Sequence, residues 1–252
     1  MELLLFRAAL APSLVLLASL VARRSGPRRG GQLLGAPTST GPFLALTWLG
    51  SGPGRAAAAA HGTVTGTLVV ACFCLAYGRL AATRRPLRTL LAALGCAAAG
   101  NVWLTAALTV AVVGGGLLTW PATAAGALPP GRPRAWEIPV RMAFSAVTVL
   151  AALAAATALG SFVGGVLSAL PVLLSVMGTS VHRTAGPRAA ADLMRGALTS
   201  AAGTLGFLLV LCFAPVPLGP GIAFLLAGSA LVLGDALLRC CVLREVGTAR
   251  TA

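Results

Sequence analysis

Two prolines that interrupt apolar segments are the features of this sequence best suited to binding a solute. Pro37 is followed by three small polar residues, and Pro171 is followed by Ser175. A broken helix frees backbone donors and acceptors at membrane depth, and paired breaks in two halves of a transporter point to a midplane site. The simpler alternative is that each proline only kinks a packed helix, while a serine or threonine satisfies the freed carbonyl. Both interpretations stay open at the level of sequence.

Arg7 and Arg141 stand near the starts of two apolar segments. A buried guanidinium can bind an anion through two parallel hydrogen bonds, or pair with an acidic side chain of a neighbouring helix. Because each arginine is close to the end of its segment, its side chain can instead extend to the lipid headgroups.

Asn101 and Asp235 each follow a glycine in an apolar segment, and Asp235 is the one acidic residue well inside such a segment. Acidic residues within a membrane are functional candidates, although an ion pair with Arg239 at i+4 explains Asp235 equally well. The amide of Asn101 can hydrogen-bond across helices. The full set of candidate solute-binding residues is Pro37, Thr38, Ser39, Thr40, Thr65, Asn101, Pro171, Ser175, Thr199, Asp235, Arg7 and Arg141.

Motifs for covalent or metal chemistry are missing from the sequence. There is no HExxH or GxSxG motif and no pair of carboxylates suited to magnesium–diphosphate chemistry. On a helix, the thiols of Cys72 and Cys74 would point about 200° apart, which is a poor arrangement for holding a metal ion. We therefore expect no enzymatic activity, no catalytic residue, no metal and no cofactor.

Composition predicts a helical membrane protein. Of the 252 residues, 58% are hydrophobic and 10% are charged, and the mean hydropathy is +0.92. Several apolar segments reach the ~20 residues that cross about 30 Å of hydrocarbon. The expected segments are residues 3–22, 32–49, 62–82, 87–128, 138–160, 163–181, 196–213 and 220–239. The fourth segment is too long for one crossing, and we expect a break at Gly100–Asn101 or at Gly114–Gly116.

The chain matches itself at a displacement of 134 residues. Between residues 30 and 104 the two copies share 17 identities in 75 positions, against roughly 8 expected from the abundance of Ala, Leu and Gly. Glycines and prolines are among the matches, and these residues mark backbone features rather than hydrophobicity. The matched pairs include Gly31 and Gly165, Pro37 and Pro171, Pro53 and Pro187, Gly62 and Gly196, and Gly100 and Gly234.

All 19 basic residues are arginines, and they occupy different loops in the two copies. Eight of them lie in the first and third loops of the first copy, and six lie in the second loop and the tail of the second copy. Because cytoplasmic loops are enriched in basic residues, this pattern predicts that the copies are inserted in opposite directions. Opposite insertion requires a ninth crossing within residues 105–128. Nine crossings then place all arginines except Arg7 and Arg55 on the cytoplasmic side, whereas eight crossings leave no bias.

We therefore expect an all-α polytopic membrane bundle of two inverted four-helix repeats plus one connecting helix. This arrangement has nine transmembrane helices, and eight is the alternative. The expected boundaries are residues 1–104 for the first repeat, 105–135 for the connecting helix and loop, and 136–252 for the second repeat with a short basic tail.

Each repeat has an arginine near the start of its first span, a Gly-Gly pair before its second span and a proline within that second span. In these features the chain resembles the small four-helix GlpM-like membrane proteins. The resemblance covers both repeats, and it implies a fused duplicate of such a small membrane protein.

The predicted function is a small-solute transporter or channel with its site between the repeats, or alternatively a non-transporting accessory or assembly subunit of a membrane complex. The expected partners are the lipid bilayer, an unknown small solute, and a second copy or another membrane protein. Nucleic acid is not expected, because no basic face is interleaved with aromatic residues. The composition is typical of a bacterial plasma-membrane protein. The distribution of arginines predicts that the N-terminus lies outside and the C-terminus in the cytoplasm.

Overall fold

The computed structural model describes residues 26–80, 102–118, 137–213 and 219–248, together with Ser13, Leu16 and Trp120. Every regular element in these residues is an α-helix, which confirms the all-helical fold class. The helices are α2 (Pro27–Gly35), α3 (Thr40–Ser51), α4 (Pro53–Leu80), α6 (Val102–Leu118), α7 (Glu137–Ala158), α8 (Ser161–Ser168), α9 (Val172–Phe213) and α10 (Gly219–Thr248).

Four helical stretches in the described residues are long and apolar enough to cross a bilayer. They are Pro53–Arg79, Ser161–Arg183, Ala185–Phe213 and Gly219–Leu238, the shortest of which has 20 residues. At 1.5 Å per residue, a helix of this length matches the ~30 Å hydrocarbon layer. These stretches support the predicted membrane-embedded class. Two shorter apolar helices cover Thr105–Leu118 and Met142–Ala158.

Both predicted proline breaks interrupt helices. Residues 36–39 separate α2 from α3, residues 169–171 separate α8 from α9, and each connection contains the expected proline, which has no amide hydrogen for a helical bond. Each connection contains a backbone hydrogen bond from an amide to the carbonyl two residues earlier. The amide of Thr38 donates to the carbonyl of Ala36, and the amide of Val172 donates to the carbonyl of Leu170, both at 2.7 Å.

Glycine–proline pairs set the two sharp turns that follow these breaks. Gly52 (φ 86°, ψ 170°) caps the end of α3, and α9 bends at Gly186 (φ 86°, ψ 175°). Glycine adopts a positive φ readily, and the next residue is a proline, which suits the first turn of a new helix. Gly26 before α2 (φ 87°) and Gly160 before α8 (φ 99°) form a second pair. The members of both pairs are 134 positions apart.

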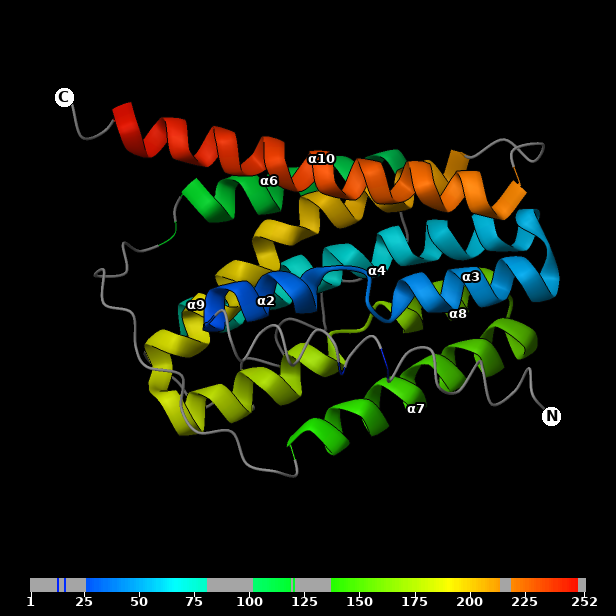
Figure 1. Ribbon diagram of the computed structural model, residues 1–252, viewed down its shortest axis with the longest axis horizontal. Helices are drawn as coiled ribbons and strands as arrows, with labels where there is room; N and C mark the ends of the chain where they lie inside the picture. The colour runs from blue at the N-terminus through cyan, green and yellow to red at the C-terminus, as the bar shows by residue number, and fades with distance from the viewer. Residues whose placement is uncertain are drawn as a thin grey trace.

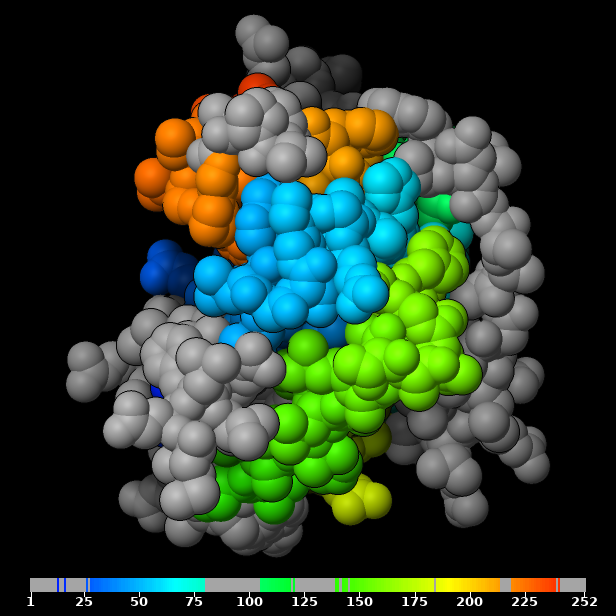
Figure 2. All heavy atoms as spheres, turned by 90° about the vertical axis from the view of Figure 1, so that its right-hand side faces the viewer, coloured from blue at the N-terminus to red at the C-terminus, as the bar shows by residue number. Residues whose placement is uncertain are grey.

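The two broken segments run in opposite directions (Figure 1). α2 lies at the left and α3 at the right of the view, whereas α8 lies at the right and the first half of α9 extends to the left. α4 and the second half of α9 are antiparallel in the same way. Figure 2 shows the right-hand end, where the turn between α3 and α4 lies between α10 and the pair formed by α7 and α8.

α2 packs closely on the second half of α9 because glycines remove the side chains between them. A Cβ atom at Gly31 would overlap the carbonyl oxygen of Leu193, and a Cβ atom at Gly196 would overlap the carbonyl oxygen of Arg28. The two helices therefore touch through their backbones, as small residues allow in membrane bundles.

α8 packs on α4 through a matching pair of glycines. A Cβ atom at Gly165 would overlap the carbonyl oxygen of Ala59, and one at Gly62 would overlap the carbonyl oxygen of Phe162. All four residues of this contact are 134 positions from their counterparts in the contact between α2 and α9. The close contacts thus join the second helical segment of each sequence copy to the third segment of the other.

The second half of α9 forms the centre of the bundle and α10 forms an outer helix. The most apolar part of Ala185–Phe213 is 72% buried, whereas the most apolar part of Gly219–Leu238 is 11% buried. α10 exposes Leu225, Val232 and Leu237. An exposed face of this kind is compatible with contact to lipid tails, which are as apolar as leucine.

α6 lies in the segment predicted to connect the repeats. It continues through Gly114–Gly116 without interruption, so the suggested break at these glycines is wrong. Gly116 instead packs against the side chain of Leu75, because the missing Cβ lets α6 approach α4 closely. The other suggested break, Gly100–Asn101, lies outside the described residues.

Candidate functional site

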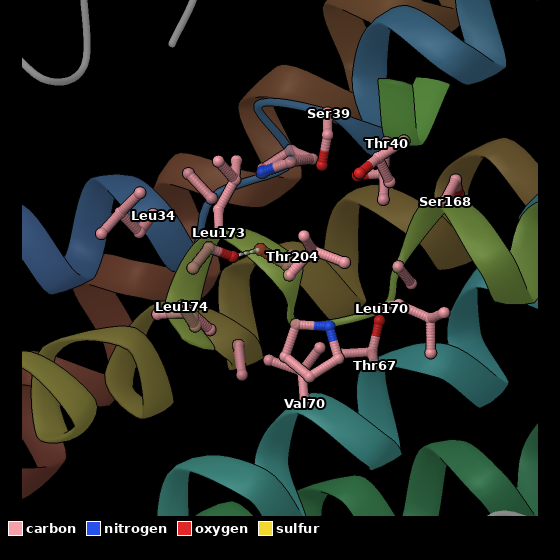
Figure 3. Close-up of a pocket in the computed structure, with 18 residues that line it drawn as sticks. Leu34, Ser39, Thr40, Thr67, Val70, Ser168, Leu170, Leu173, Leu174 and Thr204 are labelled. Atoms are coloured by element: carbon pink, nitrogen blue, oxygen red, sulfur yellow. Dashed lines mark hydrogen bonds between the residues drawn. The ribbon is translucent and has the colours of Figure 1, made fainter. Parts of the chain in front are cut away.

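A cavity of about 60 Å³ lies between the two proline breaks (Figure 3). This volume accommodates a few water molecules or one small solute. Sixteen of the eighteen lining residues form eight pairs whose members are 134 positions apart. The pairs are Leu34 and Ser168, Gly35 and Ala169, Ala36 and Leu170, Pro37 and Pro171, Ser39 and Leu173, Thr40 and Leu174, Thr67 and Ala201, and Val70 and Thr204. Thr148 and Val172 complete the lining.

Four of the residues predicted from sequence line this cavity: Pro37, Ser39, Thr40 and Pro171. Thr38 belongs to the first connection but not to the lining. Ser175 is also outside the lining, and its hydroxyl donates to the carbonyl oxygen of Pro171 at 2.7 Å. Ser175 therefore satisfies a carbonyl freed by the break, as the simpler interpretation of these prolines expects.

Thr65 and Thr199 make hydrogen bonds away from the cavity. The hydroxyl of Thr65 donates to the carbonyl oxygen of His61 at 3.4 Å. The hydroxyl of Thr199 donates to the carbonyl oxygen of Gly196 at 2.7 Å and accepts from Nε2 of Gln32 at 3.4 Å. The structure thus gives both threonines packing roles and does not place either in the cavity lining.

Asp235 is not part of the cavity lining either. It lies on α10, and its Oδ1 atom is directed at Gly203 of α9, where the missing side chain leaves room for the carboxylate. Arg141 lies in α7, and its side chain is outside the described part of the structure. Arg7 and Asn101 are also outside the described residues.

Sequence reasoning missed four hydroxyl-bearing residues of the lining: Thr67, Thr148, Ser168 and Thr204. Thr204 donates from Oγ1 to the carbonyl oxygen of Gly35 at 2.8 Å, which satisfies the last carbonyl of α2. The sequence repeat could have identified Thr67 and Thr204, because residues three positions apart lie on the same face of a helix. Residues 67 and 70 and their counterparts 201 and 204 are such positions on α4 and α9.

The lining is uncharged, and its surface is more apolar than polar. It contains the hydroxyl groups of Ser39, Thr40, Thr67, Thr148, Ser168 and Thr204, and no Asp, Glu, Lys, Arg or His. The charged groups of the described residues lie elsewhere. Asp192 on α9 interacts electrostatically with Arg28 on α2 and with Arg195 on its own helix. This group links the two helices near the arginine-rich end of the bundle.

No cluster of metal ligands is found in the described residues. No three His, Cys, Asp or Glu side chains lie close enough together there to hold a metal ion.

The fold and the cavity define the class as an α-helical membrane protein with a small uncharged cavity between two broken helices. Comparison with models of known families, with curated proteins and with solved structures finds no match. The function is therefore argued from the geometry of this site.

Proposed function

We propose that this protein is a small-solute transporter or channel whose binding site is the cavity between the proline breaks. The observation that carries the proposal is the composition of the cavity wall. Eight pairs of lining residues come from equivalent positions of the two sequence copies. A site between repeats, built on discontinuous helices, is the arrangement by which many transporters hold a solute at the centre of the membrane.

The proposal includes two inverted repeats. Three observations support them: opposite directions of the two broken segments, positive φ at glycines 134 positions apart, and reciprocal glycine contacts at the same displacement. A two-fold relation accounts for these contacts, since it makes every contact between the copies occur twice.

Nine crossings follow from inversion, with α6 as the connecting helix. The distribution of arginines supports the orientation. Arg28 lies in the first turn of α2, Arg79 in the last turn of α4 and Arg188 just after the bend of α9, whereas Arg55 lies in the first turn of α4. In Figure 1 α4 runs from right to left, so its two ends lie at opposite ends of the bundle. Basic residues favour the cytoplasmic side. We accordingly place the left-hand end and the C-terminus in the cytoplasm of a bacterium, and the N-terminus outside.

Filling the cavity is the test of this function. In proteoliposomes, Ser39→Phe is expected to reduce solute flux at least about tenfold, because an aromatic ring blocks a constriction of this size. The flux panel would include small neutral solutes such as urea and glycerol, and small monovalent anions and cations. Ser229→Phe on the exposed face of α10 is the matched control, and we expect it to keep wild-type flux.

Two results of this experiment count against the proposal. One is wild-type protein that conducts none of the panel. The other is a Ser39→Phe variant that unfolds at the wild-type temperature and still conducts every solute that the wild type conducts.

A second candidate function is that of a non-transporting accessory subunit. The observation that favours it is the outer face of α10, which is the least buried of the four long apolar stretches. This face exposes Leu225, Val232 and Leu237, and exposed apolar faces can pack on another membrane protein. A stoichiometric membrane partner that dissociates when Leu225 and Val232 are replaced by tryptophan, together with no solute flux, would favour this function over transport.

A further inference from the structure

Carbonyl groups of the two breaks that line the cavity already accept hydrogen bonds. The carbonyl oxygen of Gly35 accepts from Thr204 at 2.8 Å, and that of Pro171 accepts from Ser175 at 2.7 Å. The carbonyls of Ala36, Pro37 and Leu170 each accept from a backbone amide. The two breaks are therefore poorly suited to bind a cation, because these acceptor atoms are occupied.

The helix N-termini at the same cavity have donors to offer. α3 begins at Thr40, and Ser39 at its N-cap makes no side-chain hydrogen bond to the helix. α9 begins at Val172, which also lines the cavity. The amides of Gly41, Val172 and Ser175 already donate to backbone carbonyls, and Pro42 has no amide hydrogen. Within the described part of the chain, the amides of Thr40, Leu173 and Leu174 are left without a backbone acceptor. The C-termini of α2 and α8 at the same cavity oppose the partial charges of the two N-termini, so the free donors, and not a net helix charge, decide what binds.

Thr40 adds a buried hydroxyl group that has no hydrogen-bond partner in the described residues. The residue is only 7% exposed and lines the cavity. Figure 3 shows the hydroxyl oxygens of Thr40 and Ser39 on the same side of the cavity wall. Buried polar groups are almost always hydrogen-bonded in folded proteins, so the Thr40 hydroxyl is a group that a molecule in the cavity would bond.

We propose that the solute is a small monovalent anion, of the size of chloride, nitrate or formate. It accepts hydrogen bonds from the Thr40 hydroxyl and from the amides of Thr40, Leu173 and Leu174. No carboxylate lines the cavity, so an anion meets no repulsion from a side chain there. The unoccupied groups are hydrogen-bond donors at helix N-termini, which bind anions, and the lack of basic side chains in the lining favours a single negative charge. The inference rests on the proposed function, for which it names the class of solute.

Binding is measured by thermal unfolding of the full chain in detergent. Potassium chloride, nitrate or formate is titrated against potassium gluconate at constant ionic strength, because gluconate is too large for the cavity. We expect the small anions to raise the unfolding temperature of wild-type protein, since a ligand that binds only the folded state stabilises it. Thr40→Val is expected to weaken anion binding, so that the half-saturating anion concentration rises at least about tenfold. Thr40→Ser keeps a hydroxyl group and is expected to keep the wild-type response.

A control on the same helix separates anion binding from folding. Thr47 is also buried in α3, but its hydroxyl donates to the carbonyl oxygen of Phe43 at 2.8 Å. Thr47→Val is expected to keep the anion response. In gluconate alone, Thr40→Val is expected to unfold no earlier than wild type, because the substitution removes a hydroxyl group that had no partner.

The results separate the anion site from transport. A wild-type protein that small anions do not stabilise, or a Thr40→Val variant with the full response, overturns the anion proposal. Flux of urea or glycerol without anion flux or stabilisation supports transport and contradicts the anion. Anion stabilisation that requires Thr40, without flux of any solute, supports the anion site and contradicts transport.

Discussion

Gly165→Ala is expected to destabilise the protein by about 1–3 kcal/mol, which is the range for forcing extra atoms into a close-packed interface. The added Cβ atom would overlap the carbonyl oxygen of Ala59, and a backbone atom cannot rotate away as the end of a flexible side chain can. α8 and α4 must then move apart. Gly31→Ala is expected to have a similar effect, because its Cβ atom overlaps the equivalent carbonyl of Leu193. Thermal unfolding in detergent measures both.

Gly41→Ala is the matched control for these two variants. Gly41 lies in α3 with nothing within 4 Å of the position of an added Cβ atom. Alanine is a better helix former than glycine by about 1 kcal/mol, so this variant is expected to be as stable as wild type or more stable. If Gly165→Ala and Gly41→Ala unfold at the same temperature, α8 and α4 do not meet through their backbones.

A cysteine at position 54 and a cysteine at position 188 are expected to react with a membrane-impermeant maleimide from opposite sides of the membrane. The two positions are exposed, lie 134 positions apart and follow the two glycine–proline turns. The background is a variant in which all six native cysteines are replaced by alanine. In intact cells Gly54→Cys should be labelled fully, and Arg188→Cys should be labelled only after permeabilisation, as the positive-inside rule requires.

The same pair of variants decides the number of crossings. If α6 crosses the membrane, an odd number of crossings separates positions 54 and 188, and the labels appear on opposite sides. If α6 does not cross, the number is even and both cysteines are labelled from one side. That second result would contradict the inverted repeats and the nine-crossing arrangement together.

The sequence predicted the places where the helices break, but not the geometry of the breaks. Pro37 and Pro171 were identified because proline cannot donate a helical hydrogen bond, which is a local property of the residue. The positive φ of Gly52 and Gly186 was not predicted, although both precede a proline in matched positions. Glycine adopts many conformations, and the chain around it selects one.

The candidate site was predicted in part. Pro37, Ser39 and Thr40 were recognised from their position in the first break, and they line the cavity. Thr65 and Thr199 were selected because they match in the repeat, but they lie outside the lining. A match between copies does not by itself show which side of a helix faces the cavity, since that depends on how the helices pack.

The sequence alone determined that this chain is a helical membrane protein, because hydrophobic length and charge density are sums over residues and need no knowledge of contacts. The tertiary structure decided which segments meet. It pairs α2 with α9 and α8 with α4, and this places the two breaks around one cavity. Such pairing depends on glycines that are far apart in the chain and fit only one another's backbones. Their partners become visible only when the helices are packed.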